Sequence, residues 1–313
     1  MADFSIVTPI LNQVSTIEAC ILSVANQEVD VEHIIIDGGS TDGTLEIIRK
    51  HQSKLAYWVS EKDAGQSSAI NKGLKLASGK FFNWLNADDL LLPNALTEVK
   101  HRTNPTTQIV VGKCRHVDTS GKEIAIGNAR IWESLEATLG NYSMSQPSVF
   151  YKTKDVVALG GLNEDLHLCM DMDLWFRFLL LHGQKNILSI DSVVAHFLVH
   201  PNSKSSLLYQ EMKAEKYSLY HGLLSQFDLP NVLQDFFRKH LVPDGIIYQS
   251  ASNLNPHELL SNFSWHLMID AYEAANSKLC QQYFEVVENG SRLSSSEKLL
   301  WKARIASEKL LNR

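Results

Sequence analysis

The stretch HIIIDGGSTDGT, residues 33–44, decides the fold class. Its uninterrupted apolar run, Ile34–Ile36, is typical of a strand covered on both faces, and Asp37 opens a turn before a helix predicted over 44–51. Strands and helices alternate outward from it. This alternation predicts an α/β fold with a mostly parallel sheet flanked by helices. The other predicted strands are 4–7, 57–60 and 81–85, and the other helices are 15–26, 66–77 and one from 93.

The second half of the chain is less regular. Strands are predicted over 109–112 and 114–117, over 123–126 and 148–151, and over 187–190 and 193–196. An amphipathic helix is predicted over 171–182. Beyond about residue 205 strand signals nearly vanish, and helical periodicity covers 206–226, 231–240, 257–288 and 295–312.

Composition narrows the function classes. Of the 313 residues, 44% are hydrophobic and 20% are charged, which excludes a disordered chain, a collagen-like chain and a coiled-coil rod. The 29 Lys and Arg against 35 Asp and Glu give a net charge of −6, so we expect no nucleic-acid partner.

The apolar stretches, the first ten residues and the cysteines together predict a cytoplasmic protein. No apolar stretch approaches the roughly 18–20 residues that span a bilayer, and the start MADFSIVTPI does not read as a secretory signal. The cysteines show no metal-binding spacing and are expected to be reduced; they are Cys20, Cys114, Cys169 and Cys280.

Polar side chains follow each of the first four predicted strands. In parallel α/β sheets, ligands bind at the carboxyl ends of the strands. Asp37, directly after the isoleucines, is placed to accept hydrogen bonds from a ribose or a base imide, whereas Asp42 fits a cap of the next helix. The other polar residues at these strand ends are Thr8, Asn12, Glu61, Asp63, Asn86, Asp88 and Asp89.

The run Asn86-Ala87-Asp88-Asp89 carries the sharpest signal. Adjacent carboxylates on an exposed strand end repel each other unless a cation neutralises them. Mg²⁺ and Mn²⁺ prefer one or two such carboxylates together with substrate phosphates. The run therefore predicts a divalent-cation site that holds a diphosphate.

At these positions the chain resembles family 2 glycosyltransferases with the GT-A fold. The resemblance covers roughly residues 3–205 and implies a GT-A domain over 1–205, with a nucleotide-binding half over about 1–105 and an acceptor half over about 106–205. A C-terminal helical region over 206–313 lies outside it. The matching segments are SIVTPILN at 5–12, HIIIDGGSTDGT at 33–44, DAGQSSAINKGLKLASGKFFNWLNADD at 63–89, QPSVFY at 146–151, GGLNEDL at 160–166 and MDMDLWFRF at 170–178.

The resemblance implies that one group of residues binds the nucleotide. Asp37 would read the base, and Asn86-Ala87-Asp88 occupies the D-x-D position, with Asp88 as the metal ligand. Asn86 replaces the first acid of that motif, which leaves one fewer negative charge for the cation. The other implied nucleotide-binding residues are Thr8, Pro9, Asn12, Asp63 and Asn71.

Asp171 is the candidate general base. In the family an acidic pair opens a helix beside the acceptor and its Asp removes the acceptor proton; here Met170 replaces the Glu. The alternative for Asp171 is an acid favoured only by the helix dipole. Trp175 lies one turn further and is compatible with packing under a sugar ring or in the core.

The segment VHPNSKS, residues 199–205, resembles the closing loop of the family. His200 is predicted to touch the metal or the diphosphate, with an ordinary solvated loop as the alternative. The spacing of His196 and His200 would suit zinc only on a helix, and that region reads as a strand.

The resemblance implies transfer of a sugar, with inversion, from a nucleotide-diphosphate donor to a hydroxyl in polysaccharide, lipopolysaccharide or other glycan assembly. UDP is the donor nucleotide most expected, with dTDP or GDP as alternatives, and the acceptor is a glycan or a lipid-linked glycan. A non-enzymatic nucleotide-sugar-binding or scaffold protein is the alternative function, and Asn86 and Met170 favour it.

The last helix, around 298–313, combines basic residues with an apolar side. Such a helix can lie on anionic lipid, which predicts peripheral contact with the inner face of a membrane. Docking on its own domain is the alternative.

Overall fold

The computed structural model of the protein describes residues 2–201, 203–240, 246–248, 251 and 253–311, except for the side chains of 205–206 and 308–311. The chain forms two compact units, unit 1 (Met1–Ala129 with Ser143–Met212) and unit 2 (Arg130–Tyr142 with Lys213–Arg313). The boundary predicted at 205 thus falls near the end of unit 1, while the segment 130–142 packs with unit 2. The assignment of functions to these domains stays a prediction.

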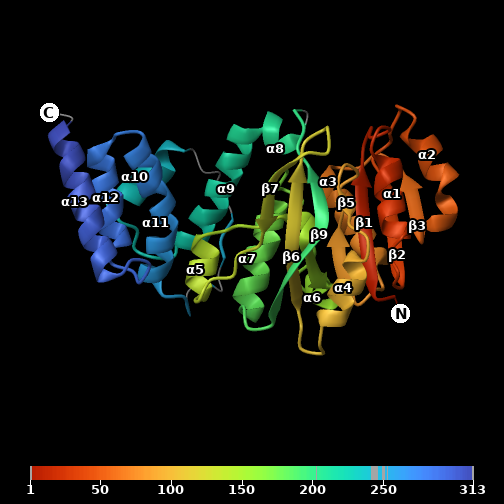
Figure 1. Cartoon of the computed structure of the whole chain (residues 1–313), viewed down its shortest axis with the longest axis horizontal. Coiled ribbons are helices and arrows are strands. Elements are labelled where there is room, and N and C mark those ends of the chain that lie inside the picture. Colours follow the sequence, from red (N-terminus) through yellow and green to blue (C-terminus); the bar gives the residue numbers. More distant parts are fainter. Residues whose placement is uncertain (1, 202, 241–245, 249–250, 252, 312–313) are drawn as a thin grey trace. The chain divides into compact units, whose positions relative to one another are not determined.

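A nine-stranded sheet lies in unit 1 (Figure 1). β1 pairs in parallel with β2 and β4, and β2 with β3, as the alternation predicts. The rest of the sheet is mixed. β6 is parallel to β9 and antiparallel to β7 and β8. Two further antiparallel pairs are β4 with β8 and β5 with β9. The strands are β1 (Phe4–Ile10), β2 (Val31–Asp37), β3 (Tyr57–Ser60), β4 (Phe81–Trp84), β5 (Leu90–Leu91), β6 (Ile109–Val117), β7 (Glu123–Asn128), β8 (Val149–Lys152) and β9 (Ile187–Leu198).

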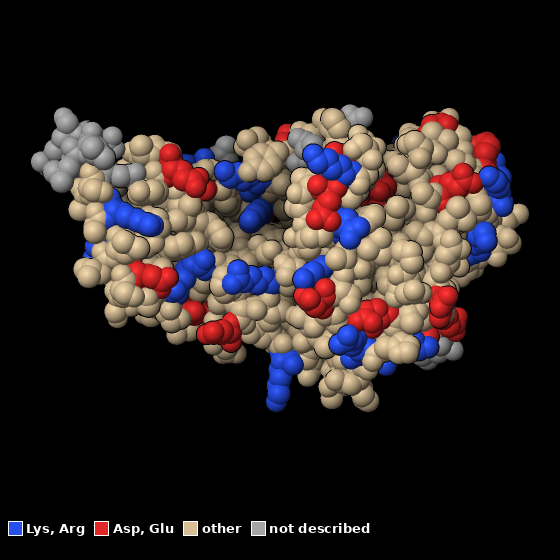
Figure 2. Space-filling model, viewed as in Figure 1, with Lys and Arg blue, Asp and Glu red and all other residues tan. Residues whose placement is uncertain are grey.

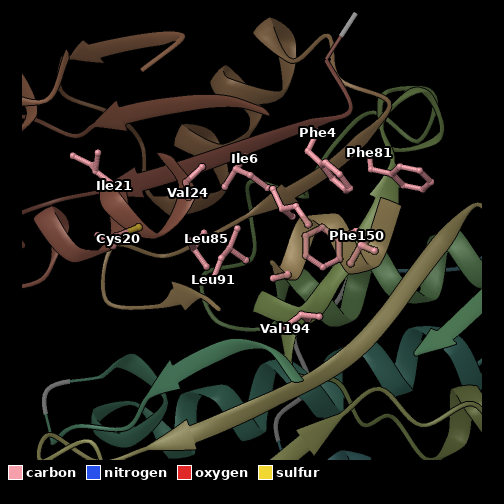
Figure 3. Close-up of a cluster of buried hydrophobic side chains, with 14 of the residues drawn as sticks. Phe4, Ile6, Cys20, Ile21, Val24, Phe81, Leu85, Leu91, Phe150 and Val194 are labelled. Atoms are coloured by element: carbon pink, nitrogen blue, oxygen red, sulfur yellow. The ribbon is translucent and has the colours of Figure 1, made fainter. Parts of the chain in front are cut away.

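Helices cover both faces of this sheet. On one face, α1 (Ile17–Ala25), α2 (Thr44–Lys50) and α4 (Ala95–Arg102) bury a cluster that includes Phe4, Ile6 and Phe150 (Figure 3). The opposite face carries α3 (Gln66–Leu76), α6 (Thr153–Ala158) and α7 (Met170–His182). Gly73 of α3 has no room for a side chain because Val7 of β1 lies against it. Three short helical turns complete unit 1: η1 (Gln52–Lys54), η2 (Gln146–Ser148) and α8 (Lys204–Leu207).

β6 and β9 are each one strand where the sequence predicts two. The pairing register between them shifts around Gly112, and a side chain at Gly112 would come within 2.6 Å of Val194. Glycine therefore marks a β-bulge and a close approach here rather than a loop, a distinction that depends on the partner strand.

Unit 2 is helical, as the loss of strand signals predicts. The predicted helical stretch 257–288 is interrupted, because Ala275 has a φ of +53° and the side chain of Asn276 then caps a new helix by accepting from Leu279 N–H at 3.1 Å. The helices are α5 (Leu135–Gly140), α9 (Tyr209–Leu224, whose first turn belongs to unit 1), α10 (Asn231–Lys239), α11 (Pro256–Glu273), α12 (Ser277–Val287) and α13 (Ser295–Leu311).

The apolar side of α13 is largely used within unit 2. Trp301 and Ile305 are buried, and the Trp301 ring lies 5.7 Å from Trp265 and 5.2 Å from Tyr272. Leu299 and Leu300 remain exposed. The predicted membrane contact stays a prediction, and the side chains of residues 308–313 lie outside the described part. Among the described residues, no helix has both the length and the hydropathy to cross a bilayer.

His33 makes the stability of unit 1 depend on pH. Its buried ring bonds to Thr8 Oγ1 at 2.9 Å, and burial lowers the pKa of His33 to about 3. An unfolded His titrates near pH 6.5, so stability is full above that pH and is lost as the pH falls toward the folded-state pKa. We expect the free energy of unfolding to fall by up to about 1.4 kcal/mol per pH unit across this window. Urea unfolding at a series of pH values measures this. The free energy of unfolding should depend less steeply on pH in His33→Gln than in the wild type, and equally steeply in the exposed His101→Gln. Equal slopes in the wild type and both variants would contradict this.

Candidate functional site

The carboxyl ends of β1, β2, β3 and β4 meet at one edge of the sheet, as the sequence predicts. The register pairs Asp37 of β2 with both Ile10 and Ser60. Asn12, in the loop after β1, joins that loop to the loop after β2, because its N–H donates to Ser40 Oγ at 2.7 Å and its side-chain oxygen accepts Thr41 N–H at 2.9 Å.

Asp37 is turned into the protein. Its carboxylate has no exposed surface and accepts hydrogen bonds from the backbone N–H groups of Gly39 and Ser40, both at 3.0 Å. The hydroxyls of Ser40 and Ser60 donate to it as well, the latter at 2.6 Å. Asp37 therefore holds the loop after β2, and its implied contact with a base stays a prediction.

Three further residues implied to bind the nucleotide have buried side chains. Thr8 lies on the α1 side of the sheet, where its hydroxyl bonds to His33 and lies 3.8 Å from Cys20 Sγ. Pro9 is buried in β1, and Ala87 belongs to the core cluster beside α1. Contacts of these residues with a ligand would have to come from their backbone.

Asp63 is half-buried, and its carboxylate lies beside Gly38, just after the end of β2. A Cβ built on Gly38 would lie 2.9 Å from Asp63 Oδ2, so the glycine leaves room for this carboxylate at the end of β2. Asp63 Oδ1 accepts from Gly65 N–H at 2.9 Å, which fixes its orientation.

The two acids of the 86–89 turn point in different directions. Asp89 is fully buried and accepts the backbone N–H of Leu198 at 3.2 Å and Asn86 Nδ2 at 3.2 Å. Burial, together with the adjacent charge of Asp88, raises the pKa of Asp89 well above its usual value. The amide oxygen of Asn86 accepts from Gln66 Nε2 at 2.8 Å, so it is already engaged.

Asp88 faces His200, which lies 112 positions further along the chain. His200 Nε2 is 3.1 Å from Asp88 Oδ2, and the two side chains are 19% and 23% exposed. Four residues on, Lys204 Nζ donates to Gln66 Oε1 at 2.8 Å. The segment after β9 thus reaches the strand edge, and Gln66, to which the sequence analysis assigned no role, joins it to Asn86.

Asp88 and His200 could together hold a cation whose remaining coordination positions are filled by a bound ligand and by water. Among the described residues, no group of three or more His, Cys, Asp or Glu side chains could hold an ion unaided. One carboxylate with one imidazole leaves most coordination positions to phosphate oxygens and water, which suits Mg²⁺ or Mn²⁺.

The side chain of Asn71 forms hydrogen bonds to the loop that precedes α7. Its Oδ1 accepts Leu162 N–H at 2.8 Å, and its Nδ2 donates to Leu162 O and to Glu164 Oε1, both at 2.9 Å. A side chain at Gly161, where φ is +78°, would collide with Asn71. The loop that leads to α7 is therefore anchored on α3, and the implied role of Asn71 in nucleotide binding stays a prediction.

A buried ion pair holds the same loop from the other side. Arg177 binds Asp173 at 2.7 Å and donates to the backbone oxygens of Leu159 and Gly161 at 3.0 and 2.8 Å. Asp173 is buried, so the second acid of MDMD is structural.

Asp173→Asn is expected to lower the free energy of unfolding by about 3 kcal/mol, because it leaves the Arg177 charge uncompensated in a largely buried place. Urea unfolding would measure this. The matched control is Glu46→Gln, which breaks an exposed helical pair with Arg49 and should cost less than about 0.5 kcal/mol. Equal losses in both variants would contradict the structural role of Asp173.

Asp171 lies at the start of α7 and is half-buried. Its Oδ1 accepts Met172 N–H at 2.8 Å. Burial, and then the negative charge of Asp171, raise the pKa of Tyr151 well above its usual value. Trp175 is buried, which assigns it to the core rather than to an exposed stacking surface.

The fold of the chain is of the GT-A type. Residues 5–157 match the family model described as glycosyl transferase family 2, so this part of the chain belongs to that family. An uncharacterized glycosyltransferase of Rickettsia typhi is 26% identical over 193 residues, which are 56% of this chain and 58% of that protein. The match thus covers little more than half the length of this relative.

Solved structures support the fold over nearly the whole chain. TarS 1–349 of S. aureus, solved with UDP, has a TM-score of 0.57 at 18% identity and covers 98% of this chain and 88% of its own. A mannosyltransferase of Pyrobaculum calidifontis, solved with GDP-Man and Mn²⁺, has a TM-score of 0.53 at 15% identity, with coverage of 100% and 88%.

Proposed function

We propose that the chain transfers a sugar from a nucleotide-diphosphate donor to an acceptor hydroxyl, with inversion, in the assembly of a glycan. The pairing of Asp88 with His200 carries the proposal. It joins the turn after β4 to the segment after β9, next to the loops of three other strand ends. Membership of residues 5–157 in the family supports it.

Asp88 and His200 would hold the divalent cation. When bound, the cation supplies positive charge that offsets the charge developing on the leaving nucleoside diphosphate. The mannosyltransferase that shares the fold was solved with Mn²⁺, which supports Mn²⁺ or Mg²⁺ as the ion. Lys204, one short turn after His200, is within reach of the same edge through Gln66 and would add positive charge there.

The base and ribose would lie over the loops after β1, β2 and β3. We expect Asp63, rather than Asp37, to accept the imide N–H of the base, because Asp37 has no exposed surface and already accepts four hydrogen bonds from the protein. UDP remains the most expected nucleotide, with dTDP and GDP as alternatives.

Asp171 would act as the general base. Its carboxylate takes the proton of the acceptor hydroxyl while that oxygen attacks the anomeric carbon from the face opposite the leaving diphosphate, and the bond from the anomeric carbon to the phosphate oxygen breaks. The loop 159–166, anchored by Asn71 and Arg177, positions the start of α7. The acceptor is expected to be a glycan or a lipid-linked glycan, and the cytoplasmic location stays a prediction.

Donor turnover tests this function. The protein would be incubated with Mn²⁺ and with UDP-, dTDP- or GDP-sugars, with and without a panel of oligosaccharides, and the released nucleoside diphosphate measured. We expect release from one nucleotide class, accelerated by an acceptor. Binding of a nucleotide sugar without any release would favour the alternative, a binding or scaffold protein.

A further inference from the structure

Unit 2 contains a cluster of arginine and tryptophan side chains that the proposed transfer does not use. The guanidinium carbon of Arg130 lies 3.8 Å from the ring centroid of Trp132, and that of Arg292 lies 5.3 Å from the same ring and 4.7 Å from Trp265. Two cations therefore share one indole. Figure 2 shows Lys and Arg side chains gathered over α5 and α9 of this unit.

These two guanidinium groups lack a salt-bridge partner. In the part of the chain that the structure describes, no carboxylate lies within salt-bridge distance of Arg130 or Arg292. Burial, then the charge of Arg130, lowers the pKa of Arg292 to about 10, and Glu258 offsets this only in part. Arg130 is exposed and Arg292 is half-buried, so the two like charges beside Trp132 repel each other weakly, and a bound anion would offset that repulsion.

Arg292 is held in a fixed orientation. Its Nη1 donates to Asn141 Oδ1 at 2.5 Å and to Asn262 Oδ1 at 2.9 Å, and the two asparagines bond to each other at 2.7 Å. A guanidinium has five N–H donors, so Nε and Nη2 keep donors beyond these bonds. Because the side chain is already ordered, binding an anion costs little conformational entropy.

We propose that Arg130 and Arg292 form a binding site for the carboxylate or phosphate group of an acidic saccharide. The planar fork of arginine matches the two oxygens of a carboxylate or a phosphate. The saccharide part rests on the proposed function, whereas the oxyanion part rests on this cluster alone. A nucleic acid is disfavoured because the whole chain is acidic and the cluster has two unpaired cations rather than a basic stripe.

Calorimetric titration of the full chain tests the site. The probes are an oligogalacturonate, an oligosaccharide of phosphorylated mannose, a neutral maltooligosaccharide, inorganic phosphate and single-stranded RNA. We expect one of the two acidic saccharides to bind and the neutral one not to bind. Arg130→Gln should weaken that binding about tenfold, since it removes charge-assisted hydrogen bonds from an exposed side chain. Arg292→Lys should weaken it as well, because it keeps the charge and loses the fork.

The matched control is Arg238→Gln, which removes an exposed arginine of unit 2 that is paired with Asp235, and it should leave the binding unchanged. Thermal unfolding checks that each variant folds. Any of four results would overturn the proposal. Arg130→Gln could bind the acidic saccharide as tightly as the wild type, or the neutral saccharide could bind as tightly as the acidic one. Inorganic phosphate could bind while neither acidic saccharide does, or RNA could bind more tightly than both. UDP titrated into the same samples separates the two claims, because its binding depends on Asp88 and not on Arg130.

Discussion

Asp171→Asn is expected to lower donor turnover by about 10²–10⁴-fold while nucleotide affinity stays within about twofold of the wild type. An amide of the same shape can still accept the Met172 N–H bond that Asp171 makes at 2.8 Å, so the start of α7 should be preserved. It cannot, however, take up a proton from an acceptor hydroxyl. The loss should therefore appear in kcat and not in binding of the donor.

The comparison needs a matched acid that lies outside the site. Asp165 is an exposed carboxylate in the loop that precedes α7, and Asp165→Asn should turn over the donor at the wild-type rate. Turnover would be followed by release of the nucleoside diphosphate and affinity by calorimetry. Near-normal turnover of Asp171→Asn would remove this residue from the role of base.

Asp88→Asn should abolish the metal dependence of nucleotide binding and lower turnover by about 10²–10³-fold, the range seen when one group that stabilises developing charge is removed. The substitution takes away the negative charge that Asp88 brings to His200 and to the cation. The fold should persist, because Asp89, not Asp88, makes the buried bond to Leu198.

Asp191→Asn is the control for Asp88, since Asp191 is an exposed acid that pairs with Lys113 on β6. Its nucleotide affinity should rise with Mn²⁺ as in the wild type. If Asp88→Asn also kept a full response to Mn²⁺, the cation would have to be held elsewhere, and the proposed pair of Asp88 and His200 would be wrong.

The predictability of the fold differs between local and long-range features. The alternation around Ile34–Ile36 predicts the parallel half of the sheet, because periodicity and turn residues are local signals. The bulge at Gly112 and the helix break at Ala275 were not predicted. Both depend on a partner, β9 for the bulge and the packing of α11 against α12 for the break, and neither partner is visible in the local pattern.

The candidate site shows the same division. The carboxyl ends of the first four strands meet at one edge, as predicted. The resemblance implies that His200 touches the metal or the diphosphate, and this role stays a prediction although the structure brings His200 to Asp88. The direction of each side chain was not predictable, because the turn after the strand sets it. Asp37 turns inward to hold its loop, and Asn71 reaches Leu162 across 91 positions. The resemblance includes Asp63 among the nucleotide-binding residues, and the contacts of Asp37 are what lead us to propose Asp63 as the carboxylate that meets the base.

Nucleotide binding by the full chain tests the central claim most directly. UDP, dTDP and GDP would each be titrated calorimetrically in Mn²⁺ and in excess chelator. The account predicts that one of them binds in Mn²⁺ and that its affinity falls at least about tenfold in chelator, because Asp88 and His200 hold the diphosphate through the cation. No binding of any of the three, or equal affinity with and without Mn²⁺, would contradict it.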